Sequence, residues 1–282
     1  ETGRPLHHAI VWQCRRGDDV CRRLAHDGHA EYITARTGLP LDSYFPAPKL
    51  TWLLEQRPDI RGALTSGRAL FGTIDTYLIY RLTRGTVHAT DHSNASRTLV
   101  YDIHTQAWNS ELCALFGIPP CALPEIRESA DVFGETDAEG RLPAPVPICG
   151  VMGDSQAALF AQRCFTPGSA KVTLGTGSSV LVNIGAAPRR GPRGIATTMA
   201  WRLHGAPVYA FEGNVHCTGA TIAWLKDQLG IMTHAAESEA AARRVPDNGG
   251  VCLTMAACAS CPRLPDWVRR TGMIRPAPRF WA

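Results

Sequence analysis

Three stretches of the sequence combine small residues with groups that can handle protons or phosphate. Asp154 lies between a glycine turn and an alanine-rich run in GDSQAALF, LGTGSS spans residues 174–179, and EGNVHCTGA spans residues 212–220. Glycine-rich turns and helix starts present backbone N–H groups that bind phosphate oxygens. The three stretches together therefore indicate phosphate chemistry, with the Asp154 carboxylate available to take part in it.

The same stretches also have ordinary structural explanations. Asp154 could cap a helix, because its side-chain oxygen can accept from the N–H groups of the first turn. LGTGSS could be a simple hairpin turn, and it matches neither the dinucleotide fingerprint nor the Walker loop, because Lys171 precedes the glycines. The local sequence leaves both explanations open.

The elements that position these residues are predicted from hydrophobic spacing and from turn residues. The apolar centre of residues 7–16 predicts a buried strand that leads into a helix, and a second strand should follow the proline-rich residues 140–150 and lead into Asp154. Alternation around a glycine turn predicts a hairpin, and the domain boundary should fall near residues 162–170. Helices are expected within residues 15–28, 44–60 (ended by Pro58), 71–83, 110–126 and 218–231, and the hairpin within residues 170–185.

Composition narrows the class of protein. The formal net charge is +4, with 29 basic and 25 acidic residues, and the basic residues are scattered, so nucleic-acid binding is not favoured. The sequence shows neither a signal-peptide pattern nor an apolar run near the roughly 20 residues that a membrane span needs. The 10 cysteines are too sparse and irregular for a disulfide scaffold, which predicts free thiols and a cytoplasmic location.

Several longer motifs resemble one known family. YFPAPKLTWLLEQ, residues 44–56, fits the spacing Y-x-P-x-x-K-[apolar]-x-W-[apolar]-x-E-Q of the FGGY carbohydrate kinases. ETGRPLHHAIVWQCRR, LFGTIDTYLIYRLT, HATDHSNASRTLVYDIHTQAWN and GDSQAALFAQ are similar to the glycerol kinase branch of that family. The resemblance runs from residue 1 to about residue 251.

The resemblance implies an α/β fold of the actin/hexokinase-like (ribonuclease H-like) kind, truncated here, in which two domains close over a polyol. Residues 1–165 would be the substrate domain without its start, and residues 166–251 the beginning of the nucleotide domain. The implied reaction is phosphorylation of a polyol, glycerol foremost, by ATP with Mg²⁺. The family often forms dimers or tetramers, so a homo-oligomer is possible.

On the substrate side, the resemblance assigns roles to individual residues. Asp154 matches the catalytic base and could also hold a metal-bound water, Trp12 matches the ring that packs on the polyol carbons, and Tyr44 matches a hydroxyl that bonds a substrate oxygen. Ser155 stands beside the base where these kinases commonly carry glutamine, and Ser179 where many carry phenylalanine. Both changes remove bulk, which leaves a longer polyol or a ketose open as an alternative substrate.

On the nucleotide side, Thr176 matches a threonine that contacts phosphates and Gly219 a glycine that lines the nucleotide site. Ala223 replaces a glutamine that contacts nucleotide in the family. Glu212 lies in the family's Glu-Gly turn, and we expect a structural role for it.

Residues 252–282 do not continue the family pattern. Read in a shifted frame, the codons for residues 266–274 permit LGAPYWDD, which resembles a family motif, so we expect a frameshift product without a role for its Cys258-x-x-Cys261 pair. The family's opening phosphate turn and its adenosine-binding segment are not recognised. The parent protein would be the active kinase, and the chain as written would be an inactive fragment of it. A non-catalytic protein that retains a partial polyol pocket stays open as the second hypothesis.

Overall fold

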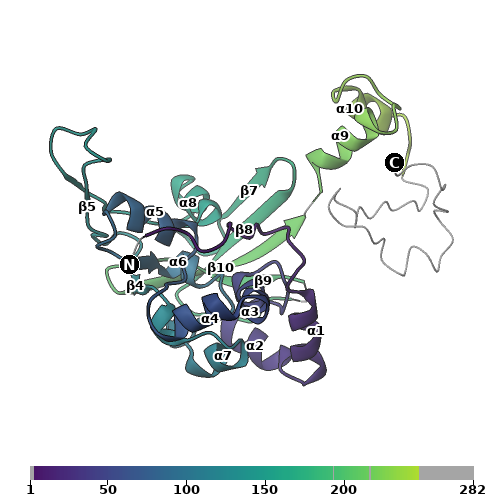
Figure 1. The fold of residues 1–282 in the computed structure, drawn as a ribbon. Helices are drawn as coiled ribbons and strands as arrows, with labels where there is room; N and C mark the ends of the chain where they lie inside the picture. The colour runs from purple at the N-terminus through teal and green to yellow at the C-terminus, as the bar shows by residue number, and fades with distance from the viewer. Residues whose placement is uncertain (1–2, 193, 216, 248–282) are drawn as a thin grey trace. The chain divides into compact units, whose positions relative to one another are not determined.

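The computed structural model describes residues 3–192, 194–215 and 217–247, so the predicted tail at residues 252–282 lies outside the described residues. The chain forms two compact units (Figure 1). Unit 1 combines Glu1–Val172 with Ser179–Gly213, and unit 2 combines Thr173–Ser178 with Asn214–Ala282. The domain limits expected from the sequence stay a prediction.

Proline residues determine where two neighbouring helices of unit 1 begin and end. Proline occupies the first position of both α3 and α4, where a missing backbone N–H costs nothing. Arg57, between these two helices, has non-helical angles because the following proline excludes the helical conformation. The helices of unit 1 are α1 (Asp18–His26), α2 (Ala30–Thr37), α3 (Pro46–Gln56), α4 (Pro58–Thr65), α5 (Ile74–Leu82), α6 (His92–Ala95), α7 (Ser110–Leu115), the 3₁₀ turn η1 (Pro120–Ala122) and α8 (Asp154–Ala161).

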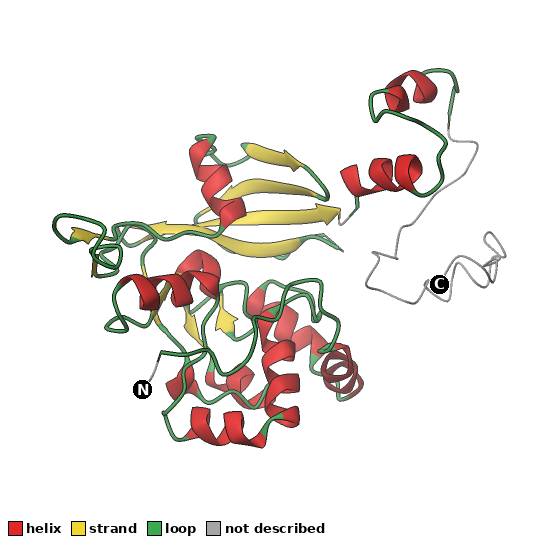
Figure 2. Cartoon of the chain, turned by 45° about the horizontal axis from the view of Figure 1, so that its top comes forward, coloured by secondary structure: helices red, strands yellow, loops and turns green. Residues whose placement is uncertain are grey.

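The largest sheet has the strand order β7-β8-β10-β9. Its strands are β7 (Ala170–Leu174), β8 (Ser178–Gly185), β9 (Ala196–Leu203) and β10 (Ala206–Val215). Figure 2 shows most helices of unit 1 grouped on one side of this sheet. The shorter strands form three pairs: β1 (Ala89–Asp91) with β4 (Glu125–Arg127) in parallel, β2 (Tyr101–Asp102) with β3 (Ala107–Trp108), and β5 (Glu135–Thr136) with β6 (Val146–Pro147).

Two apolar clusters hold the elements that carry the site. The larger one fills the space between α1, α3, α4 and α7. In the second, Leu159 of α8 packs with Trp201 and Ala200 of β9 and Ala210 of β10, so α8 is fixed against the sheet. Unit 2 contributes α9 (Gly219–Asp227) and α10 (Glu237–Ala242).

Two of the predicted strands are wrong. Residues 7–16 are irregular, with turns at residues 12–13 and 16, and Val11 and Trp12 are exposed. Among the described residues no strand pairs with this segment, and a strand without a neighbour leaves its backbone groups unbonded. The strand expected directly before Asp154 is also not formed, because β6 ends at Pro147 and residues 148–153 are irregular. The predicted helices and the hairpin at 170–185 are confirmed.

Candidate functional site

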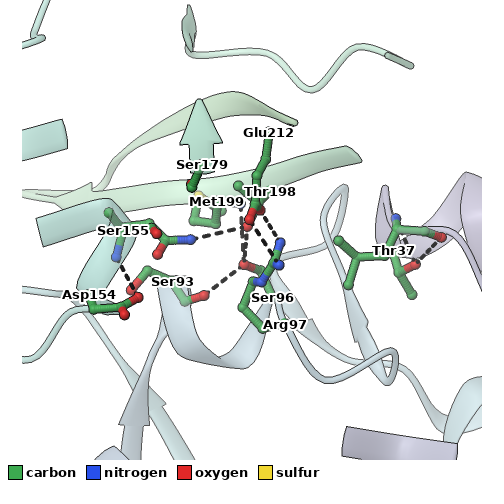
Figure 3. A network of polar contacts seen from close by, with 12 residues as sticks. Thr37, Ser93, Ser96, Arg97, Asp154, Ser155, Ser179, Thr198, Met199 and Glu212 are labelled. Atoms are coloured by element: carbon green, nitrogen blue, oxygen red, sulfur yellow. Dashed lines mark hydrogen bonds and ion pairs between the residues drawn. The ribbon is translucent and has the colours of Figure 1, made fainter. Parts of the chain in front are cut away.

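Asp154 is the first residue of α8, and Gly153 occupies the cap position before it. No side chain caps this helix, so Asp154 is not the capping residue that its sequence position allowed. Its Oδ1 accepts from the N–H of Ser155 at 2.6 Å (Figure 3), and the side chain is exposed. A negative charge at this position interacts favourably with the positive end of the helix dipole. The carboxylate therefore faces solvent, where it can meet a ligand.

Trp12 and Tyr44 lie against each other, 5.6 Å between ring centroids and with ring planes tilted by 58°. Trp12 is exposed, whereas Tyr44 is half-buried. Burial raises the pKa of Tyr44, the positive charge of Arg97 opposes this, and the negative charges of Glu212 and Asp154 add to it. Tyr44 therefore lies within electrostatic reach of Asp154 and in contact with Trp12.

A largely buried ion pair lies near Tyr44. Arg97 donates from Nη1 to Oε2 of Glu212 and from Nη2 to Oε1, the latter at 3.1 Å (Figure 3), and Glu212 is only 5% exposed. The guanidinium also lies 5.1 Å from the ring centroid of Phe45, the residue next to Tyr44. A bidentate pair of this kind fixes the orientation of both groups, which agrees with the structural role expected for Glu212.

Lys171 is a charged residue of the site that sequence reasoning missed. It is 1% exposed, and its Nζ donates to Oγ of Ser179 at 3.3 Å. Burial lowers the pKa of Lys171, and the nearby negative charges of Asp154 and Glu212 oppose the shift. The ammonium group therefore lies near Asp154, and Ser179 is part of the same polar group of residues. A lysine within a short, mostly apolar strand was the signal that could have revealed it.

The two residues assigned to nucleotide contact lie together in unit 2. The N–H groups of Gly219 and Ala220 donate to the carbonyl oxygens of Gly175 and Thr176 at 3.0 and 3.1 Å. A Cβ on Gly219 would lie 2.6 Å from the Gly175 oxygen, so only glycine fits there. These two N–H groups are therefore engaged in hydrogen bonds within the protein. Ala223 is exposed on the same helix, α9.

The described residues contain no group of three or more His, Cys, Asp or Glu side chains that could hold a metal ion. Magnesium commonly binds through one or two carboxylates and the substrate phosphates, and it retains several waters. A single exposed carboxylate such as that of Asp154 fits this mode. The part of the chain that the structure describes also holds no helix long and apolar enough to cross a membrane.

The sequence of this chain is similar to those of known carbohydrate kinases. Residues 1–161 match the model of the FGGY family of carbohydrate kinases, N-terminal domain. Glycerol kinase of Rhodospirillum centenum is 49% identical over 257 residues, which cover 90% of this chain and 51% of that protein. Glycerol kinase 2 of Thermotoga maritima is 46% identical over 250 residues, or 89% and 50% of the two chains. The chain therefore spans about half the length of the curated relatives that it matches.

Solved structures agree with the sequence comparison. A Plasmodium falciparum glycerol kinase with ADP has a TM-score of 0.80 and 34% identity, over 86% of this chain and 49% of that one. A ligand-bound xylulose kinase from Lactobacillus acidophilus has a TM-score of 0.75 at 20% identity, over 86% and 48% of the two chains, and shows likeness of fold alone. The α/β fold of actin/hexokinase-like kinases that the sequence motifs predict is confirmed.

Proposed function

Because the chain belongs to the FGGY family of carbohydrate kinases, we propose that the protein transfers a phosphoryl group from ATP to a small polyol, namely glycerol. The relatives at 44–49% identity are named glycerol kinases, which supports glycerol over a longer polyol or a ketose. The observation that carries the proposal is the placement of the exposed Asp154 carboxylate at the start of α8, within electrostatic reach of Tyr44, which in turn contacts Trp12.

In the proposed reaction, the Asp154 carboxylate takes the proton of a primary hydroxyl as that oxygen attacks the γ-phosphorus of ATP. A bond forms between the hydroxyl oxygen and phosphorus, the bond from phosphorus to the β-γ bridging oxygen breaks, and ADP leaves. Trp12 would pack on the polyol carbons, and Tyr44 and Ser155 would bond its oxygens. General base catalysis of this kind contributes about 10²–10⁴-fold, and positioning supplies much of the rest.

The proposed nucleotide residues are Thr176 and Gly219 of unit 2. Their support is the close contact between the hairpin turn and the start of α9, which leaves no room for a side chain at Gly219. Magnesium would be held by the ATP phosphates and, through water, by Asp154. When bound, it neutralises charge on the transferred phosphoryl group.

We also propose a cytoplasmic location, which the free thiols of the described cysteines support. We also propose that the active enzyme forms a homo-oligomer, because members of the family often do. Size-exclusion chromatography with light scattering measures the molar mass of the assembly.

The test is phosphoryl transfer from ATP to glycerol, xylitol and a ketose by the purified chain, with Asp154→Asn as the critical variant. We expect glycerol to be the preferred acceptor and Asp154→Asn to lower kcat by about 10²–10⁴-fold, because the amide cannot take the proton. Asp59→Asn is a matched control, since Asp59 is an exposed aspartate in the first turn of α4, and it should leave kcat unchanged.

Two results would contradict the proposal. Equal turnover by Asp154→Asn would remove Asp154 from the chemistry. Glycerol binding in calorimetry without turnover above background would favour the second hypothesis, a non-catalytic protein with a partial polyol pocket.

A further inference from the structure

The turn that carries Asp154 is attached to α6 through a serine hydroxyl. The backbone N–H of Gly153 donates to Oγ of Ser93 at 2.9 Å, across 60 residues of sequence. Ser93 Oγ in turn donates to Oδ1 of Asp91 at 2.9 Å. Asp91 and Ser93 are both fully buried. The residue directly before Asp154 is therefore held by a hydrogen bond to a buried serine hydroxyl.

Asp91 sets the direction of the Ser93 hydroxyl. The Asp91 carboxylate also accepts from the N–H groups of Ser93 and Asn94 at 3.0 Å, from Nδ2 of Asn94 at 2.8 Å and from Oγ of Ser129 at 2.7 Å. A serine hydroxyl has one hydrogen to donate and two lone pairs to accept with. Because that hydrogen points to Asp91, the oxygen can only accept from Gly153. The arrangement therefore permits one hydrogen-bond direction, from Gly153 to Ser93 to Asp91.

A second contact holds the other side of the same helical turn. Nε2 of Gln156 donates to Oγ1 of Thr198 at 3.5 Å. Thr198 Oγ1 lies 3.0 Å from Oγ of Ser96 (Figure 3). A Cβ on Gly153 would lie 2.6 Å from Oε1 of Gln156, so a larger residue there would displace the Gln156 amide. Hydrogen bonds at Gly153 and at Gln156 therefore hold the first turn of α8 on both sides of Asp154.

From these contacts we infer that Ser93, oriented by Asp91, is a positioning residue for Asp154. This inference rests on the proposed function, since it is Asp154 as a base that needs positioning. The hydroxyl fixes the position of the Gly153 backbone, and this determines where the side chain of the next residue, Asp154, starts. A displacement of about 1 Å at a reacting group can lower a rate about 10²-fold. Loss of the Ser93 hydroxyl should therefore reduce kcat while leaving the KM for the polyol nearly unchanged.

The test compares Ser93→Ala with Ser129→Ala in the same chain. Both substitutions remove a buried hydroxyl that donates to Asp91, but only the Ser93 hydroxyl also contacts Gly153. The first readout is amide hydrogen exchange at Gly153, measured by NMR against Leu159 in the core of the same helix. We expect Ser93→Ala to speed Gly153 exchange at least tenfold, Ser129→Ala to leave it unchanged, and Ser93→Thr to restore it.

The second readout is phosphoryl transfer from ATP to glycerol. We expect Ser93→Ala to lower kcat about 10–100-fold at nearly constant KM, with recovery in Ser93→Thr and a much smaller effect of Ser129→Ala. If Ser93→Ala does not fold, Ser93→Cys retains a side chain of similar size with a weaker acceptor, and it should give intermediate values in both readouts.

The inference is overturned if the Ser93 variant exchanges its Gly153 amide at the wild-type rate, or if both alanine variants change that rate equally. The proposed function fails separately, through lack of turnover in the wild-type chain, whereas the exchange result does not depend on turnover.

Discussion

Lys171 is a buried charge in the candidate site, and its burial lowers stability. Burial removes its ammonium group from water, which lowers its pKa. The negative charges of Asp154 and Glu212 offset only part of this shift. Below the lowered pKa both the folded and the unfolded chain carry the proton, and the full cost of burial is present. As pH rises toward the usual value near 10.5, the folded chain releases its proton first, and stability increases.

We therefore predict that Lys171→Met leaves the free energy of unfolding at neutral pH unchanged or increases it, because an apolar side chain of similar length avoids the cost of burying charge. The same change should lower phosphoryl transfer, because Asp154 loses the positive charge beside it. Urea unfolding and the kinetic assay measure the two effects. A loss of more than about 1 kcal/mol would show that the pairing of Lys171 outweighs its desolvation.

At the scale of single elements, α6 combines two tasks in one helical turn. Ser93 contacts the Asp154 turn, and the preceding His92 is buried with Nδ1 2.7 Å from the hydroxyl of Tyr101. Burial lowers the pKa of His92 from 6.5 to about 4. The charge of Arg202 adds to the shift, and those of Asp91 and Glu128 oppose it. The folded chain therefore keeps His92 neutral at pH values where the unfolded chain protonates it.

This shift makes α6 sensitive to acid. Between about pH 6.5 and 4 the unfolded state binds a proton that the folded state excludes, so stability falls as the pH is lowered. We predict that the free energy of unfolding of the wild-type chain falls by about 2 kcal/mol more than that of His92→Gln between pH 7 and pH 5. Urea titrations at the two pH values measure this difference, and equal losses in the two proteins would refute the assignment.

The elements also show what could be predicted from sequence and why. Helices such as α3 and α5 carry their signals locally, in proline at the first position or in apolar spacing, and both were predicted. The strand expected at residues 7–16 was wrong, because strand formation depends on a neighbour that local sequence does not reveal. Among the candidate site residues, Trp12, Tyr44 and Asp154 are predicted from family motifs. Arg97 and Ser93 were not, because their role arises from contacts 115 and 60 residues away.

At the scale of the whole chain, the exposed apolar surface is the main feature not explained by the site. Four large apolar residues repeat along one face of α5 at helical spacing and are all exposed, namely Ile74, Tyr77, Leu78 and Leu82. A formal net charge of +4 on 282 residues gives only weak repulsion between copies. A contiguous apolar face of this kind favours association.

We predict that the purified chain self-associates through this face and that the double substitution Ile74→Gln and Leu78→Lys weakens the association at least tenfold. Burial of one such side chain contributes about 1.5–3 kcal/mol, and about 1.4 kcal/mol corresponds to a tenfold change in the dissociation constant. Size-exclusion chromatography with light scattering, over a range of concentrations, measures the change. Val132→Lys is the control, since it alters an exposed apolar residue outside α5 and should have little effect. A wild-type chain that stays monomeric at every concentration would show that the α5 face does not drive association.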